Sequence, residues 1–467
     1  MNKLHKHAFS ELYDISSGLS STKEQAGHGA PFVSFSTVFN NYFLPDELPD
    51  LMDTSMADQE KYSVKRGDIL ITRTSETVDE LAMSCVALKD YPKATFSGFV
   101  KRLRPKEKST VYDKYMAFFL RSEYFRNVIN AKTIMTLRAS FNEDIFSYLD
   151  LYLPNYEEQV KIGDFLYSIE KKIQCNNTIN DNLQHQLNLL YNYWFTQFDF
   201  PDKNGKPYRS SGGSMVWNEQ LKRDIPSGWH VTSITDNTLF QIIKPGISRF
   251  ISTKTYLATA DLVGTTILKG NKVDYNTREN RANMQPMLYS VWFAKMKNSI
   301  KHLYLGKEMK PIINGSILST GFCGLQCSKI SFEYVSSFIE HSYFENLKNT
   351  FAHGATQEAV NNDDLCNIPL LTPSDNILLL YHEQAKKMYA QIGTNICENQ
   401  KLSQLLDWLL PMLMNGQVNI KSKKEEQNKI KESGFQQWIS NQGFAARGDV
   451  DMDVLRDIYE AMDNDDK

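Results

Sequence analysis

The chain has 467 residues, of which 41% are hydrophobic and 23% charged, so it is longer than one ordinary core and we expect two or three domains. The N-terminus, MNKLHKHAFSELYDISSG, lacks an apolar segment, and no run of about 18 apolar residues follows, so we expect a cytoplasmic protein without a membrane span. The formal net charge of −3 excludes a uniformly basic surface, so any affinity for nucleic acid must come from local patches or from partner subunits.

The chain lacks the usual motifs of catalysis and metal binding. It has no phosphate-binding or dinucleotide-binding glycine loop, and no Asn-Pro-Pro-aromatic string of the kind found in adenine methyltransferases. Its nine histidines do not have metal-ligand spacing. Cys323 and Cys327 are the only close pair among six cysteines, and no second Cys/His pair lies nearby in the sequence. We therefore expect no catalytic residue, no metal site and no cofactor in this chain.

An internal repeat of about 220 residues organises the sequence. RSEYFRNVIN (121–130) aligns with EHSYFENLKN (340–349) at an offset of 219, which also carries Asn142 to Asn361 and Pro154 to Pro373. Upstream, FVSFSTVF (32–39) resembles YLATADLV (256–263), and GDILIT (67–72) resembles GSILST (315–320), at drifting offsets. Each repeat predicts short strands, a short helix, a strand that ends in Pro and then a long helix. A shared frame with loops of variable length is typical of two recognition domains on one scaffold.

Each repeat ends in a long helical segment with a heptad pattern. In the first, Ile162, Ile169, Asn176, Leu183 and Leu190 recur every seven residues, a second row holds Phe165, Ile179 and Tyr193, and the stripe is widened by Leu166, Ile173, Leu187 and Trp194. The second has Ala385, Ile392, Asn399, Leu406 and Leu413, with a further row of Met388, Leu402 and Leu409. About 40 helical residues span roughly 60 Å, and a helix of that length with one apolar stripe needs a partner. We expect the two helices to form an antiparallel coiled coil.

The two seams each carry one asparagine at the same heptad position, Asn176 and Asn399. A lone Asn among apolar core positions fixes the register of a coiled coil at some cost in stability. A half-exposed Asn without consequence is the alternative. Duplication at the matching position favours a role in register.

With these elements in place, the sequence resembles the specificity subunits of type I restriction-modification systems. LPNYEEQVKIGDFLYSIEKKI (153–173) is similar to the family's Pro-x-x-x-Glu-Gln start of its first conserved helix. WFTQFDFPDKNGKPYRSSGGSMVWNEQLKRDIPSGWHV (194–231) resembles its central linker, and LLPMLMNGQV (409–418) the end of its second helix. The second helix departs from the pattern, since Glu383-Gln384 follows Pro373 at a greater distance.

The resemblance implies an α+β fold with a pseudo-twofold repeat, in which two similar α/β target-recognition domains are joined by two long antiparallel coiled-coil helices. The expected segments are the first recognition domain (1–155), the first helix (156–199), the linker (200–226), the second recognition domain (227–375), the second helix (376–416) and a charged tail (417–467).

The resemblance also implies function and partners. Each recognition domain binds one half of a split, asymmetric site in double-stranded DNA, and the helices set the distance between the halves. The helices dock two modification subunits, the adenine methyltransferases, and two motor-nuclease subunits join in complexes that also cleave DNA. S-adenosylmethionine, ATP and Mg²⁺ belong to those partners, and the specificity subunit performs no chemistry.

Candidates for DNA contact are local groups of basic and polar residues. Arg and Gln read guanine and adenine edges, whereas Lys mostly neutralises phosphate. For any single residue, a solvated surface charge is the commoner role. The candidates are, in the first domain, Arg66, Thr72, Arg73, Thr74, Lys101, Arg102, Arg104 and Arg138, and in the second Arg278, Arg281, Lys295, Lys297, Thr356 and Gln357.

Two other functions are compatible with parts of the sequence. An architectural coiled-coil protein that spaces two protein-binding domains fits the near-neutral charge. It does not explain why the segment 194–231 resembles the central linker of the specificity subunits. An enzyme, such as a nuclease or a detached part of a fused methyltransferase, is opposed by the missing catalytic motifs.

Overall fold

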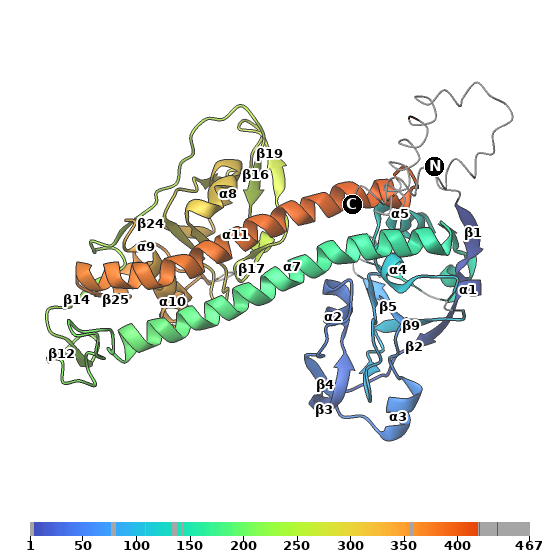
Figure 1. The fold of residues 1–467 in the computed structure, drawn as a ribbon, viewed down its shortest axis with the longest axis horizontal. Helices are drawn as coiled ribbons and strands as arrows, with labels where there is room; N and C mark the ends of the chain where they lie inside the picture. Colours follow the sequence, from blue (N-terminus) through green and yellow to red (C-terminus); the bar gives the residue numbers. More distant parts are fainter. Residues whose placement is uncertain are drawn as a thin grey trace. The chain divides into compact units, whose positions relative to one another are not determined.

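The computed structural model describes residues 4–75, 81–107, 109–132, 139–141, 143–354, 358–418, 420 and 437. The chain divides into two compact units, Met1–Ile169 with Leu406–Lys467, and Glu170–Leu405. Each unit holds one α/β domain and part of each long helix, so the division between the units passes through both helices (Figure 1). Arg138, Thr356, Gln357 and nearly all of the tail beyond Val418 lie outside the described residues.

The first domain is built on a four-stranded antiparallel sheet with the order β2-β9-β5-β7. Its strands are β2 (Tyr13–Ser17), β9 (Val100–Pro105), β5 (Ile69–Thr72) and β7 (Ser84–Val86). All residues of β5 and β7 are buried, and helix α2 (Phe35–Asn40) packs against both strands. The β-branched side chains of Ile69, Ile71 and Thr72 suit such a covered strand.

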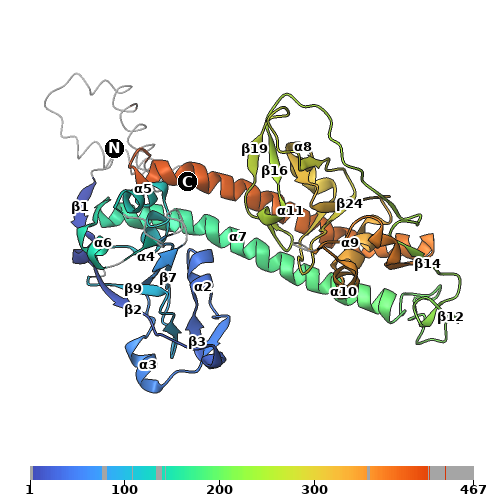
Figure 2. The same cartoon turned by 180° about the vertical axis from the view of Figure 1, so that it is seen from behind.

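A second, three-stranded sheet completes the first domain, in the order β4-β3-β8. Its strands are β4 (Asp50–Met52), β3 (Ala26–Val33) and β8 (Thr95–Phe96), and the β3–β8 pair is parallel. The short strands β1 (His5–Ala8) and β11 (Asp150–Leu153) pair antiparallel and bring the two ends of the domain together. The helices are α1 (Phe9–Leu12), α3 (Met56–Lys61), α4 (Asp113–Phe119), α5 (Glu123–Lys132) and α6 (Glu143–Tyr148) (Figure 2).

The second domain repeats this plan. Its antiparallel sheet has the order β15-β24-β21-β22, with β15 (Phe240–Ile242), β24 (Phe322–Cys327), β21 (Ser290–Ala294) and β22 (His302–Leu305). Its second sheet has the order β19-β16-β23-β20, with β19 (Asn271–Val273), β16 (Lys254–Leu257), β23 (Ser316–Ser319) and β20 (Ala282–Met284). The remaining elements are β14 (His230–Ser233), β17 (Leu262–Val263), β18 (Thr266–Ile267), β25 (Pro369–Thr372), α8 (Lys310–Gly315), α9 (Phe332–Glu340) and α10 (Ser342–Phe351).

The predicted repeat is confirmed element by element. Helices α5 and α10 begin and end at positions 219 residues apart, as do strands β11 and β25. Strand β1 pairs His5 with Leu153, and β14 pairs His230 with Thr372 in the same register. The parallel pair β3–β8 has its counterpart in the parallel pair β16–β23.

One part of the predicted alignment is wrong. GDILIT (67–72) contains β5, which pairs antiparallel with β9 and β7, whereas the strand of GSILST (315–320), β23, pairs in parallel with β16. The counterpart of β5 is therefore β21, and the counterpart of β23 is β8. Directly before that strand, Lys310–Gly315 forms helix α8 with Pro311 in its first turn, a position that proline tolerates.

The long helices are α7 (Tyr156–Tyr191), continued by a π-helical turn at Asn192–Thr196, and α11 (Asp375–Met414). Within the second unit they run antiparallel and side by side (Figure 1), because Asn176 is bonded to Asn399 and Asn180 to Asn395. The end of α7 is fixed by an aromatic cluster in which Phe195 contacts Tyr334 and Tyr381 at ring-centroid distances of 4.6 and 4.9 Å.

The seam between the helices differs in one row from the expected pattern. In the second unit, the buried or half-buried positions of α7 and the π-helical turn include a stripe with spacings of mostly three and four residues: Ile173, Asn176, Asn180, Leu183, Leu187, Leu190, Tyr191 and Trp194. Ile179 and Tyr193, which were expected in the seam, are 38% and 39% exposed. The second row of buried positions lies one residue after the expected row of Phe165, Ile179 and Tyr193. The sequence pattern assigned some of these positions only to the edge of the apolar stripe.

The linker after α7 is ordered against the second unit. Phe200 stacks on Tyr208 and on Trp229, with ring centroids 4.7 and 5.0 Å apart. A hairpin of β12 (Met215–Asn218) and β13 (Arg223–Pro226) follows and leads into the second domain. Burial of these large rings stabilises the linker as part of the core.

Candidate nucleic-acid interface

Two arginines of the predicted basic cluster, Arg102 and Arg104, serve the fold of the first domain. Arg104 makes a two-pronged contact with the buried carboxylate of Asp68 at 2.7 and 2.6 Å, and this hydrogen bonding raises the pKa of Arg104. Arg102 donates to the backbone carbonyl of Ser63 and lies over the ring of Phe96, and burial lowers its pKa. Both guanidinium groups hold the loop before β5 and offer little to a ligand.

Thr72 and Lys101 are likewise buried in the first domain. The Thr72 hydroxyl accepts a hydrogen bond from the backbone N–H of Met83 at 2.9 Å. The Lys101 ammonium lies 3.3 Å from the Glu143 carboxylate. Arg66 is 67% exposed, and its guanidinium lies 3.7 Å from Asp113. Among these residues Arg66 is therefore the one with free access to solvent.

In the second domain the two predicted arginines differ sharply. Arg278 is half-buried, donates to the carbonyl oxygens of Ala282 and Tyr275, and stacks on the Tyr275 ring at 4.3 Å. Arg281 is exposed, and its guanidinium lies close to the turn at Gly321. Lys297 is paired with Glu358 at 2.8 Å. Arg281 is thus placed for a ligand, whereas Arg278 fastens a loop.

Arg73, Thr74 and Lys295 lie at or beside a short two-stranded ribbon that both domains share. In the first domain β6 (Thr74–Ser75) pairs with β10 (Ala139–Ser140). In the second, Met296 bridges Ala359, and the N–H of Lys297 donates to the carbonyl of Glu358. We call each of these the rim ribbon of its domain.

Arg73 and Lys295 occupy the same position at the start of the rim ribbon. The N–H of Arg73 donates to the carbonyl of Phe99, and that of Lys295 donates to the carbonyl of Gly321. The carbonyl of Arg73 accepts from the N–H of Phe141, and that of Lys295 accepts from the N–H of Val360, which lies 219 residues after Phe141. The sequence alone does not pair the two residues, because the strands that precede them, β5 and β21, have little sequence in common.

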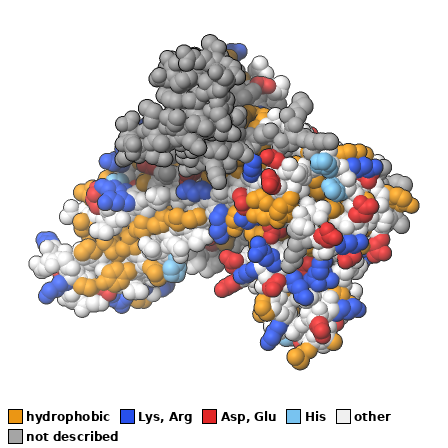
Figure 3. Space-filling view, turned by 45° about the vertical axis from the view of Figure 1, so that its right-hand side comes forward, with side chains coloured by type: hydrophobic (Ala, Val, Ile, Leu, Met, Phe, Trp, Pro, Cys, Tyr) orange, Lys and Arg blue, Asp and Glu red, His pale blue; other side chains and the backbone are white. Residues whose placement is uncertain are grey.

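Figure 3 shows basic and acidic side chains interspersed over the face in view, with no single broad basic field on that face.

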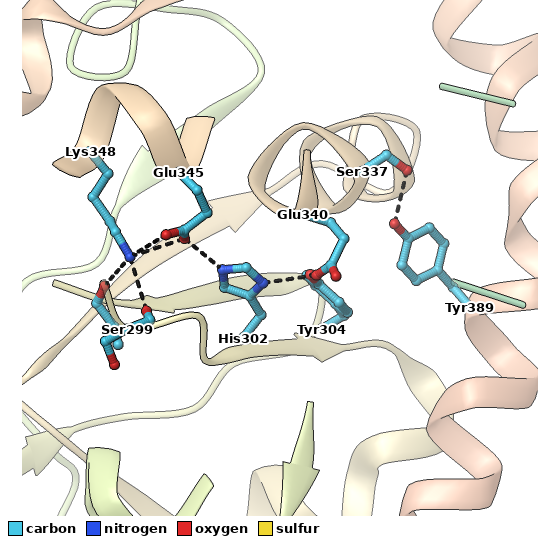
Figure 4. Close-up of polar contacts among 9 residues, drawn as sticks. Ser299, His302, Tyr304, Ser337, Glu340, Glu345, Lys348 and Tyr389 are labelled. Atoms are coloured by element: carbon cyan, nitrogen blue, oxygen red, sulfur yellow. Dashed lines mark hydrogen bonds and ion pairs between the residues drawn. The ribbon is translucent and has the colours of Figure 1, made fainter. Parts of the chain in front are cut away.

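The second domain also encloses a network of charged side chains (Figure 4). His302 contacts Glu340 at 2.8 Å and Glu345 at 3.1 Å, and Lys348 contacts Glu345 and the carbonyls of Ala294 and Ser299. Burial alone would lower the pKa of His302, but the two carboxylates outweigh it and raise the pKa. His302 and Lys348 are fully buried, so this network belongs to the core and is closed to a substrate.

Hydrogen bonds join the asparagine layer between α7 and α11, although the buried Oδ1 of Asn176 has no hydrogen-bond partner in the described part of the chain. The amide of Asn176 donates to Asn399 and to Glu398, each at 2.8 Å, and Asn399 donates in turn to Asn177. Lys172 pairs with Glu398 at 3.1 Å. Buried polar groups that find partners in only one alignment of the helices favour that alignment.

Gln159 is a residue that the sequence search quoted without assigning a role. It is buried, accepts from the N–H of Tyr112, and donates to the carbonyls of Thr110 and Pro154. Its neighbour Gly163 lies so close to α4 that a Cβ there would be 2.6 Å from the nitrogen of Tyr115. The Gln of the Pro-x-x-x-Glu-Gln pattern therefore fastens the first turns of α7 to the first domain.

The remaining features that bear on function are groups of metal-binding side chains and apolar helices. Within the described part of the chain, no three His, Cys, Asp or Glu side chains are grouped to hold a metal ion. The helices of that part include none that is both long and apolar enough to cross a lipid bilayer.

Comparison with known proteins gives one consistent result. Residues 8–185 match the type I restriction modification DNA specificity domain. The specificity subunit of the type I restriction enzyme HindI from Haemophilus influenzae is 23% identical over 441 residues, which cover 83% of this chain and 94% of the relative. That of MjaIX from Methanocaldococcus jannaschii is 22% identical over 443 residues, which cover 85% and 91%.

Among solved structures, the S subunit of a type I restriction-modification system from M. genitalium has a TM-score of 0.48 at 12% identity, covering 88% of this chain and 96% of that one. The family match and the two curated relatives confirm the resemblance seen in the sequence. Residues 8–185 are thus similar to a type I restriction modification DNA specificity domain, and over most of its length the chain is similar to specificity subunits of type I restriction enzymes.

Proposed function

We propose that the chain reads a split, asymmetric DNA site, with one half bound by each domain, and that it performs no chemistry itself. The observation that carries this proposal is the repeated topology, in which the same sheets and helices recur while the loops between them differ. Two frames with different loops recognise two different short sequences.

We further propose that α7 and α11 set the distance between the two halves and dock two modification subunits. Apolar side chains on the outside of the helix pair support a docking role, since Ile179, Leu189, Leu379 and Leu380 are each 38–57% exposed. The partners would supply S-adenosylmethionine chemistry, and motor-nuclease subunits would add ATP and Mg²⁺ chemistry where cleavage occurs. The chain needs no cofactor for its own part.

Isolated, the chain should bind double-stranded DNA weakly. Several of its candidate cations, among them Arg102, Arg104 and Arg278, are engaged within the fold. Few remain to displace counterions from the duplex, so tight binding requires the modification subunits.

Methylome sequencing of a strain with and without the gene tests the proposal. The expected result is an interrupted, asymmetric motif whose methylated adenines lie in the two outer parts and disappear with the gene. A continuous palindromic motif would contradict the proposal that each domain recognises a different half-site. If no methylation depends on the gene, the chain is an architectural spacer of two protein-binding domains.

A further inference from the structure

Arg73 and Lys295 occupy the same backbone position at the start of the two rim ribbons, although the domains differ in most other loop residues. Two hydrogen bonds fix the backbone of each residue, one to the turn before β9 or β24 and one to the strand segment that closes the ribbon. A backbone held on both sides delivers the side chain to the same point of each domain. Both repeats therefore carry a positively charged side chain at the start of the rim ribbon.

Within the described part of the chain, the fold uses neither side chain. Arg73 is exposed and Lys295 half-buried, and neither forms a side-chain hydrogen bond or ion pair with another residue of the described part of the chain. The nearby cations contrast with them, because Lys101 is paired with Glu143 and Lys297 with Glu358. The equivalent pair thus offers a free positive charge at the rim of each domain.

We propose that Arg73 and Lys295 are equivalent anchors for backbone phosphates, one in each half of the DNA site. The proposal rests on the proposed function. Domains that read different sequences share only the part of recognition that is independent of sequence, which is contact with phosphate. Arg and Lys have different hydrogen-bonding patterns toward bases and the same charge toward phosphate, so their exchange between the repeats fits an anchor and not a base contact.

The test measures DNA binding by the complex of the chain with its modification subunits. The probes are a duplex that contains the motif methylated in vivo and a scrambled duplex of the same length. Arg73→Gln and Lys295→Gln are each expected to weaken binding to both duplexes about tenfold and to lower the slope of log affinity against log salt by about one. Arg73→Lys should restore both quantities.

Matched controls are Lys61→Gln in the first domain and Lys310→Gln in the second, which are exposed lysines on helices α3 and α8, away from the rim ribbons. They should leave binding and its salt slope unchanged, and all variants should unfold at the temperature of the parent chain. The proposal is overturned if the Arg73 and Lys295 variants bind like the controls, or if they change the methylated motif, which would assign them to base reading. A parent complex that binds neither duplex would instead contradict the proposed function.

Discussion

Asn176 and Asn399 are joined by a hydrogen bond of 2.8 Å, although they lie 223 residues apart at the same position of the two repeats. Asn180 and Asn395, four residues along each helix in opposite directions, are joined in the same way. The two bonds together define one antiparallel alignment of α7 and α11. Sliding either helix by seven residues would place these amides opposite apolar side chains, which leaves buried polar groups without partners.

Single and double substitutions measure this alignment. Asn176→Leu should lower the free energy of unfolding by about 1–3 kcal/mol, because the Asn399 carbonyl oxygen loses its donor in a buried site. The double variant with Asn399→Leu should cost less than the sum of the two single changes, and slipped helix pairings should blur the gap in the methylated motif. Denaturant unfolding and methylome sequencing provide the two readouts. Strictly additive costs with an unchanged gap would mean that the asparagines do not set the register.

The matching positions of Asn176 and Asn399 and the internal repeat could be predicted from sequence because both rest on spacing. Identities at a constant offset of 219 placed α5, α10, β11 and β25 correctly. The alignment of GDILIT with GSILST failed because both are buried strands of small and β-branched residues, which look alike whatever their neighbours are. Only the pairing of β5 with β9, and of β23 with β16, distinguishes the two sheets.

The candidate contacts were harder to predict, because a sequence shows charge but not partners. Arg104 and Arg281 look equally available in the sequence, yet one is bound to Asp68 and the other is exposed. Partners of this kind come from distant segments, as Asp68 and Arg104 are 36 residues apart. Arg73 and Lys295 became a pair only once their backbone hydrogen bonds were known.

Arg278 and Arg281 provide a direct comparison of an arginine that is engaged within the fold and an exposed arginine that we propose as a DNA contact. Arg278→Ala should cost about 1–2 kcal/mol of stability, since it removes donors to the carbonyls of Ala282 and Tyr275. Arg281→Ala should change stability by less than about 0.5 kcal/mol, as is usual for an exposed side chain. It should relax the motif in the half read by the second domain and leave the other half intact. Thermal unfolding combined with methylome sequencing checks both; relaxation in both halves would contradict the assignment.

The network around His302 predicts a pH dependence confined to the second domain. At the positions of Glu340 and Glu345, the first domain has Arg121 and Arg126, which donate to backbone carbonyls and stay charged at any ordinary pH. His302 faces Glu340 from α9, Glu345 and Lys348 from α10, and Tyr304 on its own strand. The first domain therefore lacks an equivalent titrating core group at these positions.

The sign follows from the raised pKa of His302. Its contribution to stability is complete below the ordinary value of 6.5 and is lost as the pH rises through the raised value in the folded protein. Glu345 acts in the opposite sense: burial would raise its pKa, but His302 and Lys348 lower it, so its contribution is lost as the pH falls below 4.5. The second domain should be most stable between these limits.

Unfolding followed by the fluorescence of the buried Trp292 reports on the second domain. The unfolding midpoint should fall on going from about pH 6.5 to alkaline pH. His302→Gln should lower the midpoint overall and flatten this alkaline decline. A His302→Gln profile parallel to that of the parent chain would place the titrating group elsewhere.

An insertion into α7 and α11 tests whether these helices set the distance between the half-sites. The contacts of α7 and the division between the units indicate where to place it. Gln159 and Gly163 bind the first turns of α7 to the first domain, so an insertion there would damage that domain. The units divide after Ile169 in α7 and after Leu405 in α11, which leaves the layer of Asn176 and Asn399 within the second unit. Insertions are therefore best placed at Lys171 and Gln404 together.

Four residues inserted into both helices at these points should lengthen each by roughly 6 Å and turn the chain beyond by only about 40°, because four residues nearly complete a turn of 3.6. DNA rises about 3.4 Å per base pair, so the gap in the methylated motif should grow by one to two base pairs while both half-sites keep their sequences. Two residues inserted at the same points would turn the chain by about 200° and should abolish methylation. Methylome sequencing of both variants decides between the outcomes. A four-residue variant with full activity and an unchanged gap would show that the distance between half-sites is measured by something other than α7 and α11.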